Sequence, residues 1–443
     1  MTERRMTLTM FMAAFGYAND AWRHPRSRTA DIGSLAHARD MAQAAERAGL
    51  DAIFFADSND ASGLRRHGYR GVSVNEPVST IGALIGFTER IGMIGTASTT
   101  WSEPFTVARQ FGNLDQLSGG RAGWNIVTSV SGNQNFGRDE MPDPAARYDR
   151  AMEFVDVVIK LWESWDRDAI VNDKENGNWV DNERVHDIDH VGVHFRVKGP
   201  TNIPRSPQDR PVLVQAGQSP AGIELGSTYG DLIYAVQPEK AGAVAWYADY
   251  KQRVAEKGRD PEKVKILPGI IPIVGRTQAE AEELAAELDA CVTETTGRAL
   301  VSGLLDVDLS DIELNERIPQ ERLVDNPRRM ERWRLFRDMA QELTLRQLMI
   351  RMSRSTGHQS LVGTPASIAE RMIDWFDARA CDGFNFDPPN VTEGMGNMLE
   401  LLVPELQERG YFPAEHHGDT FRERAGLTLF TPREADARPA VLA

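Results

Sequence analysis

The sequence predicts a (β/α)8 barrel, a TIM-barrel fold that carries two insertions. Short β-rich runs alternate with amphipathic helical segments about eight times, which is typical of a parallel sheet with helices outside. Eight repeats favour a closed barrel over an open, doubly wound sheet. Length alone would allow several domains in 443 residues, but the continuous rhythm favours a single barrel domain enlarged by insertions.

The first four strand and helix pairs are expected between residues 7 and 165. Residues 7–15 form a β-rich run, and residues 35–50 repeat apolar side chains at the spacing of a helix. A strand at 51–57 precedes a helix at 77–90 that has a proline near its first turn. The remaining elements of this half are a strand at 91–99, a glycine-ended helix at 104–120, a strand at 121–129 and a helix at 149–165.

The second half adds four strands and two segments that break the rhythm. The predicted strands are 211–217, 232–236, 265–274 and 384–389, and the helices are 238–257, 278–288, 364–383 and about 395–409. Residues 166–210, rich in Asp, Asn, His and Pro, and residues 297–358, highly charged, are interpreted as insertions. The tail, residues 411–443, shows little periodicity, and we expect it to wrap the barrel or a neighbouring chain.

Composition excludes several classes of protein. The net charge of −15 leaves no basic surplus to neutralise phosphates, so a nucleic-acid partner is not expected. Two cysteines give neither a disulfide framework nor a zinc spacing, which suits a reducing cytoplasm. The N-terminal segment lacks a signal-peptide cleavage site, and no stretch approaches the roughly 20 apolar residues of a membrane-spanning helix.

In a barrel of this kind the carboxyl ends of the strands form the working face. The predicted strand ends carry small polar groups: Asp57, Thr96 to Thr100, Thr128 with Ser129, Gln218 with Ser219, and Asn385 with Asp387. Few of these groups are titratable, and the sequence has no G-x-S-x-G elbow, Walker A loop, H-E-x-x-H helix or G-x-G-x-x-G fingerprint. The set indicates a cofactor-holding surface more than a hydrolase site.

Two segments have both a structural and a functional interpretation. In "QAGQSPAGIELG", Ser219 and Pro220 are typical of the start of a helix, with Ser219 as its cap. The same residues suit a helix start that binds a phosphate, and the sequence favours neither interpretation. Tyr148 begins the helix after the polar loop of strand four, where packing is the commoner role and a cofactor contact the alternative. The histidines at 186, 190 and 194 are favoured as residues of a solvated insertion over a metal site.

Three loops at the predicted working face carry candidates for substrate chemistry. Arg65 and Arg66 lie in a basic cluster after strand two that would attract an anionic substrate, although a solvated loop is the simpler interpretation. After strand one, Trp22 is a candidate for the wall of the site and His24 is a candidate acid or base. His358 in "TGHQS" is a second loop histidine with the same two interpretations.

The segments "AWRHP", "FFADS", "TTWSEPFTVARQFGNLDQLSGGRAGWNIVTS", "ARYDRA", "VQAGQSPAG" and "LVPELQERGYF" together resemble one family. It is the nitrilotriacetate and dibenzothiophene-sulfone monooxygenase family of bacterial-luciferase-like, two-component enzymes, matched in order from about residue 6 to 429. The resemblance implies a (β/α)8 barrel that takes reduced FMN from a separate NAD(P)H:flavin reductase and uses O2 to oxygenate a small molecule. It also implies a homo-oligomer, a dimer or a tetramer.

Carried over by motif, the resemblance assigns Asp57 and Thr96 to the flavin ring system, and Tyr148 and Ser219 to the phosphate. Ser129 is a further expected contact. One departure stands out: relatives commonly carry a histidine four residues before this tyrosine, and here that position is Pro144. Either the flavin binds more weakly in this chain, or another group such as Arg147 or Asn135 substitutes.

The family oxidises aminopolycarboxylates, organosulfur compounds, modified cysteines and long-chain alkanes. The stretch "LTLRQLMIRMSRSTGHQSLVGTP" resembles the aminopolycarboxylate and sulfur branches, and the first-strand cysteine of the alkane branch is missing. With the basic loop, this favours oxygenation at or next to N or S of an anionic compound. The alternative from another class is a flavin-binding barrel without catalysis, acting as a carrier or sensor.

Overall fold

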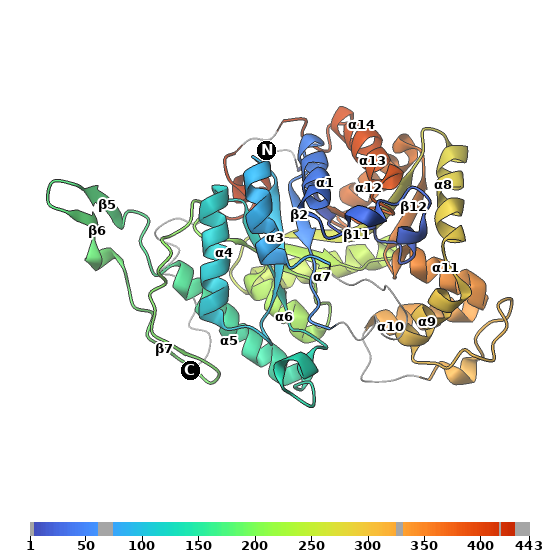
Figure 1. The fold of residues 1–443 in the computed structure, drawn as a ribbon, viewed down its shortest axis with the longest axis horizontal. Coiled ribbons are helices and arrows are strands. Elements are labelled where there is room, and N and C mark those ends of the chain that lie inside the picture. The colour runs from blue at the N-terminus through green and yellow to red at the C-terminus, as the bar shows by residue number, and fades with distance from the viewer. Residues whose placement is uncertain (1–3, 61–73, 325–330, 416–417, 430–443) are drawn as a thin grey trace.

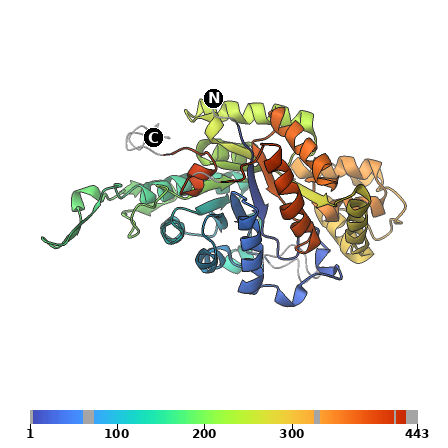
Figure 2. The ribbon, with the colours of Figure 1, turned by 90° about the horizontal axis from the view of Figure 1, so that it is seen from above.

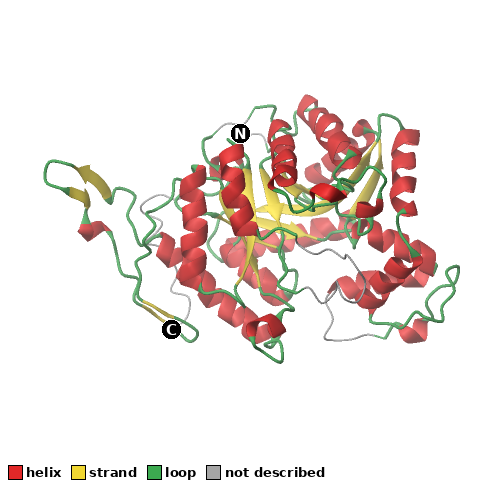
Figure 3. Ribbon diagram, viewed as in Figure 1, coloured by secondary structure: helices red, strands yellow, loops and turns green. Residues whose placement is uncertain are grey.

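The computed structural model describes residues 4–60, 74–324, 331–415 and 418–429. Eight parallel strands close into a barrel, because β1 pairs with both β2 and β13, and β10 pairs with both β9 and β11. Helices surround this ring of strands (Figure 3). The predicted barrel is therefore confirmed, with strands β1 (Thr7–Phe11), β2 (Ala52–Phe55), β3 (Gly92–Ser98), β4 (Ala122–Val127), β9 (Val212–Gln215), β10 (Leu232–Ala235), β11 (Lys265–Val274) and β13 (Gly383–Phe386).

The outer layer follows the strands in chain order (Figure 1). Its helices begin with local signals that the sequence shows, such as the proline in the first turn of α3, α4, α5, α6 and α12. α5 begins at Pro144, five residues before the predicted start, because Asp143 caps it by accepting from the Ala145 N–H at 2.8 Å. The helices are α1 (Leu35–Arg47), α3 (Pro77–Leu84), α4 (Pro104–Ser118), α5 (Pro144–Trp162), α6 (Pro220–Tyr229), α7 (Lys240–Glu256), α8 (Gln278–Ala290) and α12 (Pro365–Asp377).

The last predicted helix is continuous but not uniform. It consists of α13 (Glu393–Asn397), a π-helical segment (Met398–Leu402) and α14 (Val403–Glu408). Pro404 stands at the beginning of α14 and has no N–H to donate into the preceding turn. A π-helical segment just before a proline accommodates that missing bond.

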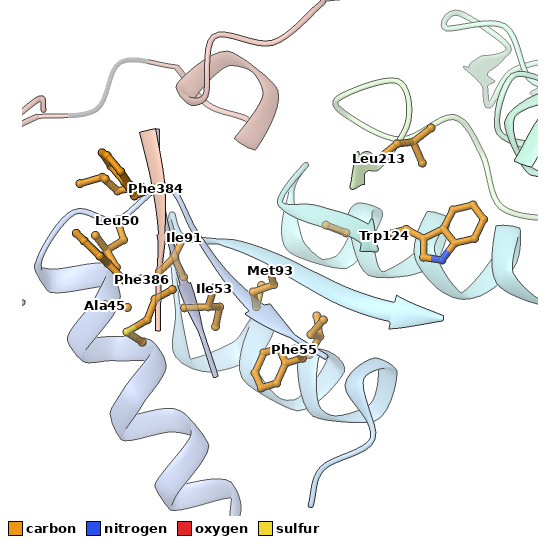
Figure 4. Close-up of a cluster of buried hydrophobic side chains, with 14 of the residues drawn as sticks. Ala45, Leu50, Ile53, Phe55, Ile91, Met93, Trp124, Leu213, Phe384 and Phe386 are labelled. Atoms are coloured by element: carbon orange, nitrogen blue, oxygen red, sulfur yellow. The ribbon is translucent and has the colours of Figure 1, made fainter. Parts of the chain in front are cut away.

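Two apolar layers hold the barrel together. Side chains that point outward from the strands, including Ile53, Met93, Phe384 and Phe386, are buried against the helices (Figure 4). Inward-pointing side chains such as Phe54, Ile94 and Val214 form a second cluster inside the ring. Burial of apolar area at about 25 cal/mol per Å² makes both layers major sources of stability.

The tail closes one end of the barrel. The short helix α15 (Phe421–Arg424) places Phe421 against Gly92 and Gly123 at the amino ends of β3 and β4. Arg422 is fully buried and pairs with Asp231 at 2.7 Å. The described part of the tail therefore packs on the barrel, at the end opposite to the expected site.

The segments interpreted as insertions form small units of their own. Two hairpins, β5 (Ile170–Asp173) with β6 (Asn178–Val180) and β7 (His190–Val191) with β8 (Arg196–Val197), extend away from the barrel body (Figures 1 and 2). The helices α9 (Glu294–Leu305), α10 (Glu331–Glu342) and α11 (Leu345–Ser355) share a separate apolar core.

One strand of the main sheet was not predicted. β12 (Gln359–Gly363) pairs with the C-terminal half of β11, Ile270–Val274, and extends the sheet beside the ring of eight strands. Across the described ranges, no helix combines the length and the apolar character needed to cross a membrane.

Candidate active site

A cavity of about 250 Å³ lies at the carboxyl ends of β1 and β2. Its wall is formed by the loop after β1, by the end of β2 with the residues that follow, and by Thr356 after α11. Tyr17, Asn19 and Asp57 contribute its largest polar side chains. A cavity of this size suits a small molecule or one part of a cofactor.

Asp57 lies on the cavity wall directly after β2. Burial raises the pKa of its carboxyl, the Ser58 N–H hydrogen bond opposes that rise, and the charge of Glu76 adds to it. The Ser58 N–H donates to Asp57 Oδ1 at 2.8 Å and fixes the carboxyl at the rim. Asp57 can therefore accept a hydrogen bond from a ring N–H at a defined position.

Thr96 and Asn125 face each other inside the barrel on the paired strands β3 and β4. The Thr96 hydroxyl donates to the Phe55 carbonyl at 2.8 Å and accepts from Asn125 Nδ2 at 2.9 Å. Asn125 Oδ1 is buried, and within the described ranges it has no hydrogen-bond partner. A buried acceptor that no donor reaches costs free energy of folding, so we expect an N–H group of a bound molecule to donate to this oxygen.

Asn125 was not predicted as a site residue. Its neighbours Trp124 and Ile126 are core residues, and the whole stretch has the pattern of a buried strand. The available signal was an amide side chain in that apolar run, because buried amides need partners.

Ser129, just after β4, is joined to its neighbours on both sides. Its hydroxyl lies 2.7 Å from the Ser98 hydroxyl at the end of β3. Its carbonyl accepts from the Arg147 guanidinium, which also donates to the Thr128 carbonyl at 3.3 Å. Arg147 therefore ties the start of α5 to the end of β4.

The polar loop after β4 lies against the loop after β2. Asn135 Nδ2 donates to the Asn59 carbonyl at 2.6 Å, and Gln134 Nε2 donates to Asp60 Oδ1 at 3.2 Å. Asn135 thus uses its amide to join two loops. Of the two groups expected to substitute for the family histidine, Arg147 keeps the larger unused donor capacity, because its buried Nε has no partner in the described chain.

Tyr148 and Ser219 meet although 71 residues separate them. Their hydroxyl oxygens lie 3.5 Å apart, where the start of α5 approaches the start of α6. Ser219 also caps α6 by accepting from the Gly222 N–H at 3.1 Å. Two hydroxyls and the amino end of a ten-residue helix therefore converge on one point, which is a suitable environment for a phosphate.

Gly217 and Gly222 keep this point open. A Cβ at Gly217 would lie 3.0 Å from the Tyr148 hydroxyl and 3.1 Å from the Gly222 Cα. The strand end and the helix start can approach so closely only because both positions lack side chains. Pro144 stands in the first turn of α5, where its fixed φ supports the start of the helix but offers no hydrogen-bond donor.

These groups fit an FMN molecule. Asn125 Oδ1 and the Asp57 carboxyl would accept from N–H groups of a bound ring system, and Tyr148 and Ser219 would donate to its phosphate. Burial lowers the pKa of Arg147, and the charges of Tyr148 and Asp143 oppose that shift, so the group is a half-buried cation beside the phosphate end. The cation compensates at least part of the phosphate charge.

Other expected residues lie elsewhere. Trp22 is 36% exposed, and His24 is buried with Nε2 3.2 Å from Glu287 Oε2 of α8; neither lines the cavity. Arg65 and Arg66 lie outside the described residues. Ser58 and Val74, which are described residues before and after that segment, line the cavity.

The three histidines of the first insertion each contact one acidic group. His186, His190 and His194 lie 3.2, 2.9 and 2.8 Å from carboxylate oxygens of Asp166, Glu153 and Asp149. In the part of the chain that the structure describes, no three His, Cys, Asp or Glu residues are grouped to hold a metal ion.

Comparison with known proteins agrees with this geometry. Residues 10–381 match the model of the luciferase-like monooxygenase family. The N-acetyl-S-(2-succino)cysteine monooxygenase of Bacillus subtilis (strain 168) is 39% identical over 430 residues, which cover 96% of this chain and 97% of the relative. Nitrilotriacetate monooxygenase component A of Aminobacter aminovorans is 36% identical and covers 99% of both chains. The structure of EDTA monooxygenase from Chelativorans sp. BNC1 has a TM-score of 0.78 at 33% identity, covering 96% of this chain and 99% of its own.

Proposed function

This chain belongs to the luciferase-like monooxygenase family, and from that premise we propose that it is the oxygenase component of a two-component system. It uses reduced FMN and O2 to oxygenate a small organic substrate. The observations that carry the proposal are the meeting of Tyr148 and Ser219 at the start of α6 and the buried acceptor of Asn125 on β4. One end of this site suits a phosphate and the other suits a flavin ring.

The protein's own residues bind, orient and shield. Tyr148, Ser219 and Arg147 hold the phosphate, while Asp57, Thr96 and Asn125 fix the orientation of the ring over the barrel mouth. Reduced FMN supplies the two electrons and activates O2 when it is bound. The loops after β1 and β2 line the cavity, and they limit the access of water to the reacting atoms.

The partner is a separate NAD(P)H:flavin reductase. One relative is named component A, which designates one part of a multi-component enzyme. In the described ranges this chain has no second domain that would supply a nicotinamide site. The two cysteines, Cys291 and Cys381, are free and buried, which is compatible with the cytoplasm, where such a reductase finds its NAD(P)H.

The substrate is a small anionic compound that is oxygenated at or next to N or S. The names of the two relatives denote carboxylated molecules, one with a central nitrogen and one with a thioether sulfur. Arg65 and Arg66, which lie outside the described residues, remain the basic groups that the sequence offers for attracting a carboxylated substrate. R65A and R66A should raise KM for an anionic substrate and leave FMN binding unchanged.

A homo-oligomer is part of the proposal. The two hairpins that extend from the barrel carry exposed apolar side chains, which are unusual on a free surface arm and suit contact with a second copy (Figures 1 and 2). Isolated two-stranded hairpins are also marginal in stability, so a contact surface would support them. The exposed residues of this arm are Ile170, Val171, Trp179, Val191 and Val193.

The test is a reconstituted assay. The protein, FMN, NADH and a purified flavin reductase are incubated with nitrilotriacetate or N-acetyl-S-(2-succino)cysteine, and with dimethyl sulfide as a neutral comparison. An oxygenase forms product and lowers the yield of hydrogen peroxide for at least one anionic compound. A flavin carrier or sensor gives no product, and the peroxide yield equals that of free reduced FMN with every compound.

A further inference from the structure

His358 and Asp387 meet at one point of the barrel mouth. Gly269 of β11 lies between them: a Cβ there would be 2.4 Å from His358 Nδ1 and 2.8 Å from Asp387 Oδ2. His358 directly precedes β12, and Asp387 directly follows β13. A glycine at 269 therefore allows an imidazole and a carboxyl from two separate strands to face the same backbone atom.

Asp387 is held in place by a chain of hydrogen bonds. Its side chain is almost fully buried, and its Oδ1 accepts from Asn385 Nδ2 at 2.8 Å. Asn385 Oδ1 in turn accepts from the Thr9 hydroxyl at 2.8 Å on the neighbouring strand β1. With Oδ1 fixed in this way, Oδ2 is the carboxyl oxygen on the side of the imidazole.

The imidazole also packs against a residue of the cavity wall. The His358 ring packs edge-on against Tyr17 with 5.5 Å between ring centroids, and Tyr17 lines the cavity. His358 is half-buried and stands two residues after Thr356, another wall residue. Nδ1 is buried on the Gly269 side, and Nε2 lies farther from that contact.

We propose that His358 holds and transfers a proton at Nε2 in the active site, and that Asp387 is its positioning residue. The proposal rests on the proposed function, since monooxygenation puts one atom of O2 into the substrate and releases the other as water. The two electrons come from reduced FMN, and a proton has to reach the leaving oxygen. An imidazolium at His358 donates that proton from Nε2 and regains one from solvent, so the group is unchanged after a turnover.

The Asp387 carboxyl lies on the Nδ1 side of the imidazole. A carboxylate beside Nδ1 orients the ring, selects the tautomer with hydrogen on Nδ1 and stabilises the imidazolium form. The ionisable groups around the pair are Tyr17 from the loop after β1 and Tyr234 of β10. Burial raises the pKa of Tyr234, and the Thr9 hydrogen bond opposes that rise while the charge of Asp387 adds to it. The Tyr234 phenol therefore does not titrate near neutral pH.

The first test needs no flavin. The protein, labelled with 15N and 13C in its nine histidines, is titrated by NMR, and the His358 signal is identified by its loss in His358→Gln. Asp387→Asn should lower the pKa of His358 by about one unit or more, because the carboxylate charge is removed. Glu153→Gln, which removes the carboxylate beside His190, is the matched control and should leave the His358 titration unchanged.

A His358 titration that is the same in wild type and Asp387→Asn would overturn the pair. If Asp387→Asn does not fold, the tautomer of neutral His358 in the wild-type protein tests the pair. Neutral His358 should carry its hydrogen on Nδ1, and a hydrogen on Nε2 contradicts the proposal. Neither outcome depends on FMN, so a failure here is distinct from a failure of the proposed function.

The second test measures turnover across pH. His358→Gln should lower kcat by about 100-fold or more, leave KM and FMN affinity near wild type, and remove one ionisation from the kcat profile. Asp387→Asn should shift that ionisation to lower pH and cause a smaller loss. His190→Gln is the control variant. Wild-type kcat and pH profile in His358→Gln would refute a proton-transfer role.

Discussion

Replacing Ser219 by alanine separates the capping role of this residue from its role at the phosphate. Ser219 Oγ accepts from the Gly222 N–H at 3.1 Å and lies 3.5 Å from the Tyr148 hydroxyl. A hydroxyl has one hydrogen to donate besides the lone pairs that cap the helix. With FMN bound, that hydrogen is available for a phosphate oxygen.

The two roles differ in size. Loss of a Ser or Thr cap costs about 1 kcal/mol of stability. Loss of a hydrogen bond to a charged phosphate costs about 1.5–3 kcal/mol of binding free energy, which is about 10- to 100-fold in Kd. S219A should therefore lower the free energy of unfolding slightly and weaken the binding of reduced FMN strongly.

Thr364 provides the matched control. It caps α12 by accepting from the Ser367 N–H at 3.3 Å and is also followed by proline. T364A should cost the same stability and leave the Kd of reduced FMN unchanged, as measured by anaerobic titration and urea unfolding. In a double-mutant cycle, S219A and Y148F should be non-additive, because their hydroxyls serve one phosphate. Equal FMN affinity in S219A and T364A would refute the phosphate assignment.

Further predictions concern charge, pH and assembly. R147M should weaken FMN binding at least about tenfold. The control is R150M, which removes another arginine of α5 that donates to a loop carbonyl and should leave FMN binding unchanged. Equal losses of affinity in the two variants count against Arg147 as a phosphate contact. Burial raises the pKa of Asp115 to about 6. Between about pH 4 and pH 6 the unfolded chain therefore loses a proton that the folded protein keeps, and the free energy of unfolding falls as pH rises. D115N should make the free energy of unfolding less dependent on pH in this range, and an unchanged dependence contradicts the raised pKa. R422M removes the shorter ion pair of the buried Asp231 and leaves it the longer one, to Arg259 at 3.6 Å, so it should cost about 3 kcal/mol in urea unfolding. A loss below about 1 kcal/mol would count against a structural role of the tail. W179S should lower the molar mass in light scattering if the hairpin arm joins subunits, and an unchanged mass excludes that contact.

The barrel was predictable because its strands and helices carry strong local signals. Residues 265–274 are almost wholly apolar, and helix starts such as Ser219 followed by Pro220 show their caps in the sequence. β12 was missed because "QSLVG" is short, half polar and adjacent to a charged segment. It forms a strand because the C-terminal half of β11 has backbone groups available for pairing with it. That partner is known only from the tertiary structure.

The helices of the second insertion were hidden by their charge. α11 nevertheless buries Leu345, Leu348, Met349 and Met352, which follow the i, i+3, i+4, i+7 spacing of an amphipathic helix. The periodicity was therefore available in the sequence, and the many arginines between these positions obscured it.

The sequence offered candidate site residues but not the contacts between them. Motifs led to Tyr148 and Ser219 separately, while their contact depends on how α5 and α6 converge. Asn125 and Asp387 had the appearance of core and strand-end residues, and their roles emerge only from the partners around them. No local pattern predicts that Gly269 brings His358 and Asp387 together, because the three positions are far apart in the chain.

The central claim is that this protein transfers one atom of O2 to a small anionic substrate at the expense of reduced FMN. The most direct measurement is a single turnover in which the protein, loaded anaerobically with reduced FMN and one of the anionic compounds, is mixed with 18O2. We expect a product with a single 18O atom and a matching decrease in hydrogen peroxide. Unlabelled compounds throughout, with one peroxide formed for each reduced FMN consumed, would contradict it.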